Sequence, residues 1–148
     1  MQLFDQLEAS QLQADQVAFN AILDALRAKP AQARELWSLG RERGFYADFE
    51  CLQDGVPHLD LRNFSEGAAE AALRWWLEEA MVERLRGGAT QRLEVITGWG
   101  KSRASGQQGD VRAAVEKIFH EMEVPMLATT NPGLLVADLA RWEPCQRA

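Results

Sequence analysis

The chain has 148 residues and a net charge of −6 at pH 7. This length suits one domain with a small addition, and such chains bury roughly 68–70% of their unfolded surface, so no disulfide or metal staple is needed. The acidic balance argues against a general nucleic-acid binder but allows a local basic site. No apolar stretch is long enough to cross a bilayer, and Cys51 and Cys145 lack metal-site spacing, so we expect a reduced, intracellular, soluble protein.

The N-terminal third has the pattern of short helices. Its first residues, MQLFDQLEAS, resemble neither a secretion signal nor an arginine-rich transit peptide. Apolar residues at roughly helical spacing predict helices over 2–13 and 17–28. Pro30 suits the first turn of a third helix and Gly44 suits its end. Residues 1–48 are therefore interpreted as an all-α helical-hairpin segment.

Breaker residues separate this segment from the rest of the chain. Asp54, Gly55 and Pro57 interrupt the helical pattern, and we place a linker there. The predicted organisation is a helical segment at 1–48, a linker at 49–55, an α/β domain at 56–142 and a tail at 143–148.

The α/β domain alternates between strand and helix patterns. HLDLR is a short strand with Leu59 and Leu61 on one face, and Ser65 is a plausible N-cap for a long helix that ends near Gly87. RLEVIT predicts a buried strand, and an amphipathic helix begins at Val111. MLATT and LLVADL predict two strands around the turn at 131–133. The order βαβαββ predicts two crossover units and a closing hairpin, hence a two-layer α/β sandwich.

A glycine-broken loop joins the RLEVIT strand to the following helix. Backbone N–H groups at such a helix start can hold a phosphate. The P-loop motif lacks its first glycine here, and the dinucleotide motif fails because Arg103 stands where its third glycine belongs. Gly98 and Gly100 still permit close backbone approach. We therefore expect this loop to hold a phosphate, but not the phosphate of a nucleotide cofactor.

Basic and aromatic side chains surround the same loop. Lys101, Arg103 and Arg112 form a basic spot, opposed locally by Asp110, that suits a nucleic-acid backbone. Trp99 either stacks on a base or plugs the strand ends, and both interpretations stay open.

Several motifs together resemble the small MutS-related (Smr) domain over about residues 56–142. They are HLDLRNFSEGAAEAALRWWL, VITGWGKSR and GDVRAAVEKIF. The TGWGK version is similar to that of plant and algal pentatricopeptide-repeat proteins that end in an Smr domain. LFDQLEASQLQAD and the segment 16–48 resemble about one and a half such repeats. Because so few repeats cannot stand alone as a solenoid, we expect the chain to be the C-terminal part of a longer protein.

The resemblance implies nucleic-acid binding and, in several members, endonuclease activity on RNA in a chloroplast or mitochondrion. If the chain is catalytic, the expected cofactor is Mg²⁺ or Mn²⁺. The family motif Leu-Asp-Leu-His reads here Leu-Asp60-Leu-Arg62, and Ser102 replaces a second family histidine. Arginine cannot take a proton as a general base, but it can clamp a phosphate. Asp60 either binds a metal or orients water, or it serves only as a structural cap. His58 shares a face with Asp60 if the strand is regular, whereas His120 is expected to be a surface residue.

In the repeat family, the fifth and last residues of a repeat read one RNA base between them. These positions correspond to Asn20 and Asp48, a pairing that the resemblance associates with uridine. The alternative is that both residues cap helices.

Three functional hypotheses follow. The first is an RNA-processing factor that binds RNA (or DNA) and cuts it. The second is a non-catalytic interaction module whose nuclease site has decayed, as the replaced histidines suggest. The third is a protein that contacts other proteins through its acidic surface.

Overall fold

The computed structural model describes residues 16–62, 64–81, 92–98, 111–131 and 133–142. Its α-helices are α2 (Gln16–Ala25), α3 (Pro30–Glu42), α4 (Glu66–Trp75) and α6 (Val111–Glu121). A π-helical turn, η1 (Trp76–Ala80), continues α4, and a 3-10 turn, η3 (Leu139–Arg141), follows the last strand. The strands are β1 (Glu50–Gln53), β2 (Val56–Asp60), β3 (Arg92–Ile96), β4 (Met126–Leu127) and β5 (Leu134–Asp138).

The described strands form one five-stranded sheet in the order β1-β2-β3-β5-β4. Strands β2 and β3 are parallel and are joined through α4, while the other neighbouring pairs are antiparallel. The elements from β2 onward follow the predicted order β-α-β-α-β-β. The α/β class expected from the sequence is therefore confirmed.

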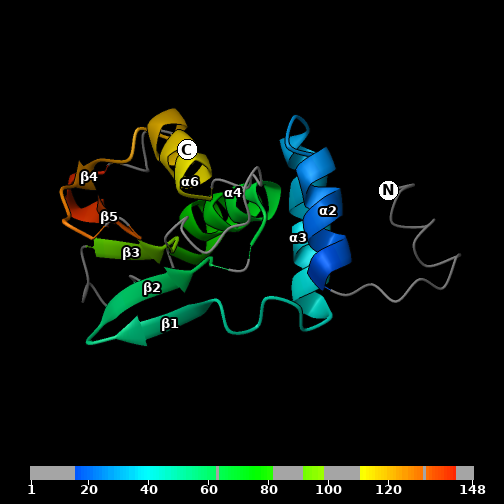
Figure 1. Cartoon of the computed structure of the whole chain (residues 1–148), viewed down its shortest axis with the longest axis horizontal. Helices are drawn as coiled ribbons and strands as arrows, with labels where there is room; N and C mark the ends of the chain where they lie inside the picture. Colours follow the sequence, from blue (N-terminus) through cyan, green and yellow to red (C-terminus); the bar gives the residue numbers. More distant parts are fainter. Residues whose placement is uncertain (1–15, 63, 82–91, 99–110, 132, 143–148) are drawn as a thin grey trace, which may run out of the picture.

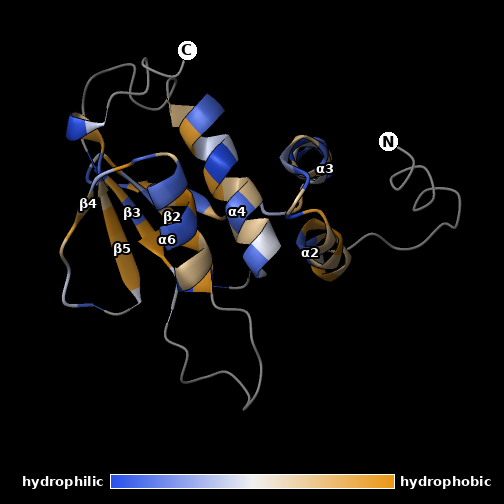
Figure 2. Ribbon diagram, turned by 90° about the horizontal axis from the view of Figure 1, so that it is seen from above, coloured by the Kyte–Doolittle hydropathy of each residue, from blue (hydrophilic) through white to orange (hydrophobic). Residues whose placement is uncertain are grey.

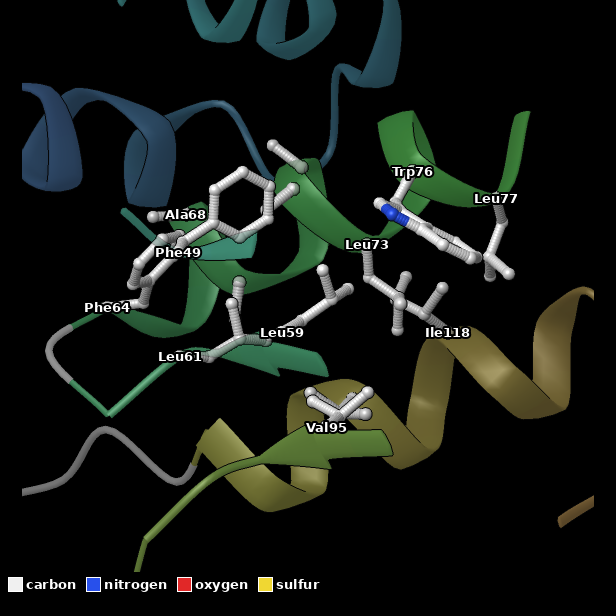
Figure 3. Close-up of a cluster of buried hydrophobic side chains, with 14 of the residues drawn as sticks. Phe49, Leu59, Leu61, Phe64, Ala68, Leu73, Trp76, Leu77, Val95 and Ile118 are labelled. Carbon is white, nitrogen blue, oxygen red and sulfur yellow. The ribbon is translucent and has the colours of Figure 1, made fainter. Parts of the chain in front are cut away.

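The hydrophobic core lies between the sheet and helices α4 and α6 (Figure 1). Alternate strand residues face the helices, so Leu59, Val95 and their neighbours are fully buried. Figure 3 shows Leu73 and Ile118 from the two helices meeting these strand residues. The opposite face of the sheet carries the partly exposed His58, Asp60 and Glu94.

The segment expected as a linker contains β1 and a tight hairpin turn. Asp54 and Gly55 have φ values of 56° and 80°. Two successive positive φ values at the centre of a two-residue loop define a type I′ turn, which joins antiparallel strands without splaying them. β1 therefore pairs with β2 through this turn, within the range 49–55 that the sequence predicts as a linker.

Helix α4 begins where the sequence predicted. The Ser65 hydroxyl accepts a hydrogen bond from the Ala68 amide at 3.2 Å, so it is the expected N-cap. The regular α-helix ends at Trp75 and continues as η1. The indole of Trp76 is buried and donates to the Glu50 carboxylate at 2.8 Å, which links this turn to β1.

Helices α2 and α3 pack on α4, on the side away from the sheet (Figures 1 and 2). Their buried side chains belong to the same hydrophobic cluster as the α/β residues. Aromatic rings fill the junction: Trp37 contacts Tyr46, Phe49 and Trp75 at centroid distances of 4.7, 5.4 and 6.0 Å. The described part of the helical segment and the α/β part thus share one core.

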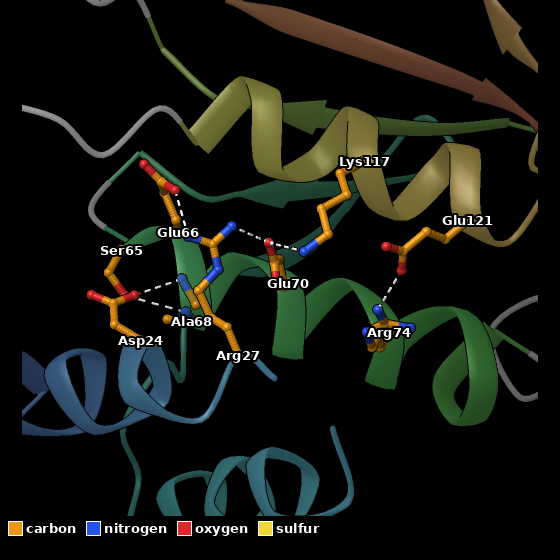
Figure 4. Close-up of polar contacts among 10 residues, drawn as sticks. Asp24, Arg27, Ser65, Glu66, Ala68, Glu70, Arg74, Lys117 and Glu121 are labelled. Carbon is orange, nitrogen blue, oxygen red and sulfur yellow. Dashed lines mark hydrogen bonds and ion pairs between the residues drawn. The ribbon is translucent and has the colours of Figure 1, made fainter. Parts of the chain in front are cut away.

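Polar contacts reinforce this junction (Figure 4). Asp24 accepts from the Gly67 amide at 2.6 Å, so a carboxylate from α2 satisfies a free amide at the α4 N-terminus. Arg27 pairs with Glu66 and Glu70. Further pairs join α3 to η1 and α4 to α6: Arg34 with Glu78 and Glu79, Lys117 with Glu70, and Arg74 with Glu121.

Within the part of the chain that the structure describes, no helix has both the length and the apolar character that a bilayer crossing requires.

Candidate nucleic-acid interface

The carboxyl ends of the parallel strands β2 and β3 lie side by side. Asp60 is opposite Ile96 in the register, and the Leu61 amide donates to the Ile96 carbonyl at 2.9 Å. The residues that follow, Arg62 and Gly98, therefore emerge at one edge of the sheet. Ligands of α/β proteins bind at such carboxyl edges.

At this edge, Asp60 and Arg62 form a bidentate ion pair. Arg62 donates from Nε to Oδ1 at 2.9 Å and from Nη2 to Oδ2 at 2.6 Å. The Arg62 backbone amide also donates to Oδ1, at 3.2 Å. The side-chain hydrogen bonds from Arg62 hold the pKa of Asp60 below its ordinary value, and the same contacts raise the pKa of Arg62. The carboxylate is thus ionised, with a donor on each oxygen.

Gly98 begins the loop and lies against Arg62. Its φ of +78° is in the left-handed region that favours glycine. A Cβ atom at this position would lie 3.1 Å from the Arg62 Cγ. The amides of Thr97 and Gly98 both donate to the Gly133 carbonyl, at 2.8 and 3.1 Å. The start of the loop is therefore held between β2 and the start of β5.

Arg112 reaches the same edge from the first turn of α6. Its Nη1 donates to the Leu134 carbonyl at 3.4 Å, and its Nε lies 3.4 Å from the Glu116 carboxylate. Leu134 is opposite Ile96 in the sheet, so Arg112 lies beside the strand end from which the loop departs. Its guanidinium is held by these partners at the candidate site.

The remaining predicted loop residues lie outside the described part of the chain. They are Trp99, Gly100, Lys101, Ser102, Arg103 and Asp110. The expected helix over 2–13 and Cys145 also lie outside it.

His58 shares the open face of β2 with Asp60, as the sequence predicted for a regular strand. Its Nδ1 lies 2.9 Å from the Val56 carbonyl oxygen and its Nε2 lies 2.8 Å from Glu94 Oε1. Both ring nitrogens therefore have oxygen partners, so the ring links β2 to β3. The sequence did not indicate Glu94, although its place opposite His58 follows from the parallel register.

The two residues predicted to read an RNA base lie in different environments. The Asn20 Oδ1 accepts from the Tyr46 hydroxyl at 2.9 Å, and its backbone carbonyl accepts from the Ser65 hydroxyl at 3.1 Å. Asn20 is therefore part of the junction between α2 and α4, and its partner Ser65 lies three residues after Arg62 in the chain. Asp48 is exposed. Their role in base reading stays a prediction.

A metal ion finds few ligands among the described residues. They contain no group of three or more His, Cys, Asp or Glu side chains arranged to hold one. Asp60, the candidate ligand, already has an Arg62 donor on each oxygen. Because Mg²⁺ binds through carboxylate oxygens, the described residues do not fit Mg²⁺ or Mn²⁺ in this arrangement.

Comparison with known proteins adds a structural likeness. No family model matches the chain, and no curated protein matches it. Among solved structures, the chain is similar to the solution structure of the SMR domain of NEDD4-binding protein 2. The two are 27% identical, the match covers 60% of this chain and 88% of that chain, and the TM-score is 0.48.

Proposed function

We propose that the chain binds the backbone of single-stranded RNA at the edge formed by the ends of β2 and β3 and the start of α6. In this proposal, residues 56–142 are an Smr-like domain and the N-terminal helices are of the pentatricopeptide-repeat type. The sequence motifs support the family, and their resemblance to plant and algal proteins extends the proposal to RNA processing in a chloroplast or mitochondrion.

One geometric observation carries the binding proposal. Arg62, Gly98 and Arg112 come from three distant segments, yet all lie around the ends of β3 and β2. The loop with Lys101 and Arg103 in its sequence departs from Gly98. A phosphate at this edge would therefore meet the backbone at Gly98 and the guanidinium groups of Arg62 and Arg112, which is the chemistry that positions nucleic-acid backbones.

The same geometry favours binding without cleavage. Arg62 stays protonated at neutral pH, so it cannot accept a proton from an attacking nucleophile. Both oxygens of Asp60 accept hydrogen bonds from Arg62, which leaves this carboxylate poorly placed to bind a metal or to orient water. We therefore favour a binding module with a decayed nuclease site over an active endonuclease.

Fluorescence anisotropy with a labelled, uridine-containing single-stranded RNA tests the proposal, with DNA of the same sequence for comparison. We expect affinity to fall steeply with salt, since phosphate contacts release counterions. The Lys101→Ala/Arg103→Ala variant should bind several-fold more weakly. Arg92→Ala/Arg141→Ala is the matched control, because it removes the same charge at the opposite end of β3, beside Asp138.

Three results would count against the proposal. Absence of salt-dependent RNA binding would favour protein contacts through the acidic surface. Equal weakening in the control variant would indicate a nonspecific charge effect. RNA cleavage in Mg²⁺ or Mn²⁺ that disappears in Asp60→Ala would establish the endonuclease alternative.

A further inference from the structure

The charge of Arg62 at the candidate site is already neutralised by another side chain of the protein. The fork of Arg62, through Nε and Nη2, holds both carboxylate oxygens of Asp60. Among the described residues, Asp60 is its one recorded ion-pair partner. The two charges cancel, so the pair as it stands adds no net positive charge to this edge.

The Asp60–Arg62 pair is nevertheless open to solvent and lies close to Gly98, the first residue of the glycine loop. The Arg62 side chain is 60% exposed, so an incoming phosphate can reach its guanidinium. The stem of Arg62 lies beside Gly98, where a Cβ would be 3.1 Å from Cγ. An RNA backbone bound beside Gly98 would therefore pass within reach of this guanidinium, and it would also meet the carboxylate of Asp60.

We propose that Asp60 is an internal competitor of the RNA phosphate for Arg62, and that it limits the affinity of the site. Asp60 is a carboxylate in the position that a phosphate oxygen would occupy, since both anions bind the guanidinium fork in the same two-pronged manner. This inference rests on the proposed function, because it concerns the regulation of the same RNA-binding edge.

Electrostatics predicts the direction and the size of the change in RNA binding when Asp60 loses its charge. In the natural chain, a phosphate at Arg62 replaces one anion by another, and the net gain is small. If Asp60 loses its charge, Arg62 becomes a free cation, and each cation that neutralises a phosphate of single-stranded nucleic acid steepens the salt dependence of log Kobs by about 0.7. If Asp60 instead supported RNA binding as a metal ligand, the Asp60→Asn change would weaken binding.

Three variants measured with the same labelled RNA test the inference. Asp60→Asn should bind about three- to ten-fold more tightly at low salt, with a salt slope steeper by about 0.7. Arg62→Ala should bind several-fold more weakly, because the carboxylate then faces the RNA alone. The double variant Asp60→Asn/Arg62→Ala should return to the natural affinity, because it removes both members of a neutral pair.

A matched control separates the local effect from net charge. Asp138→Asn makes the same chemical change at the opposite end of the sheet, opposite Arg92 in the register. Its amide oxygen can still accept from the Ala140 amide, as the carboxylate does at 3.2 Å. We expect no change of slope in this variant, and circular dichroism checks that each variant is folded.

The outcomes distinguish a failure of the competitor role of Asp60 from a failure of the proposed RNA binding. If RNA binding needs Lys101 and Arg103 but Asp60→Asn leaves it unchanged or weakens it, the competitor role is wrong and the proposed function stands. If Asp138→Asn raises the affinity as much as Asp60→Asn does, the effect is one of net charge and the inference is again wrong. If the natural chain and Asp60→Asn both fail to bind RNA, the proposed function itself fails.

Discussion

A methyl group added at Gly67 tests how closely the helical segment is docked on the α/β part. Gly67 lies in the first turn of α4, directly against the end of α2. A Cβ there would lie 2.5 Å from the Asp24 Cα, 2.5 Å from the Leu23 carbonyl oxygen and 2.6 Å from the Asp24 nitrogen. These are backbone atoms, so they cannot rotate away as a side chain can. Gly67→Ala therefore has to push α2 away from α4.

The cost can be worked out from the contacts that would be lost. Overpacking typically costs about 1–3 kcal/mol, and contact with fixed backbone atoms belongs at the upper end of that range. Separation of the helices also breaks the bond from the Gly67 amide to Asp24, and a helix cap contributes about 1–2 kcal/mol. Alanine is favoured over glycine in a helix by about 1 kcal/mol, which offsets part of the loss. We expect a net loss of about 3 kcal/mol, or a Tm lower by about 10 °C for a chain of this size.

Urea unfolding of the whole chain, followed by circular dichroism, measures this loss. Asp24→Ala is the control, because it removes the cap and adds no atoms at the interface. We expect it to cost about 1–2 kcal/mol, less than Gly67→Ala. A Gly67→Ala chain as stable as the natural one would refute the close approach of α2 and α4.

Two further predictions concern charged groups. Glu70 is 4% exposed and pairs with Arg27 and Lys117, so Glu70→Gln should lower the free energy of unfolding by about 1–2 kcal/mol. A double-mutant cycle of Glu70→Gln with Arg27→Met should give a clear coupling energy, whereas additive losses would contradict the pairing. The pKa of Asp60 is lowered, so its pair with Arg62 stabilises the fold above the ordinary value of 3.8 and is lost only as pH falls through the lower, folded-state pKa. Carbon NMR of the Asp60 carboxyl should give a midpoint below 3.8 that returns toward this value in Arg62→Ala, and an unchanged midpoint would mean that Arg62 does not cause the shift.

Most elements of the α/β part could be predicted from the sequence, because their signals are local. The stripe that begins at Val111 has helical spacing, and α6 forms there. Ser65 satisfies an amide three residues away, so the start of α4 was predictable as well. β1 was not predicted, since an edge strand with three exposed residues in four lacks the alternation of a half-buried strand. An Asp-Gly pair is typical of a type I′ hairpin turn, but the breaker residues around it favour a linker equally well.

The candidate site, too, could be predicted from the sequence only in part. The sequence predicted that the LDLR motif ends one strand and that the glycine loop follows another. The parallel pairing of β2 with β3 places Arg62 and Gly98 at one edge. It could not indicate that Arg62 would turn back onto Asp60, because an exposed guanidinium two residues away can point toward solvent equally well. Only the folded arrangement decides which partner a long side chain takes.

By itself, then, the sequence determined the α-helices among the described residues, most strands, their order and the acidic balance of the chain, since these depend on periodicity and on neighbours within a few residues. The tertiary structure decided the contacts between distant segments. His58 meets Glu94 only through the register of β2 and β3, and Arg27 meets Glu66, 39 residues away, only because α2 docks on α4. The free energy of such contacts depends on how whole elements pack, and no short pattern in the sequence records it.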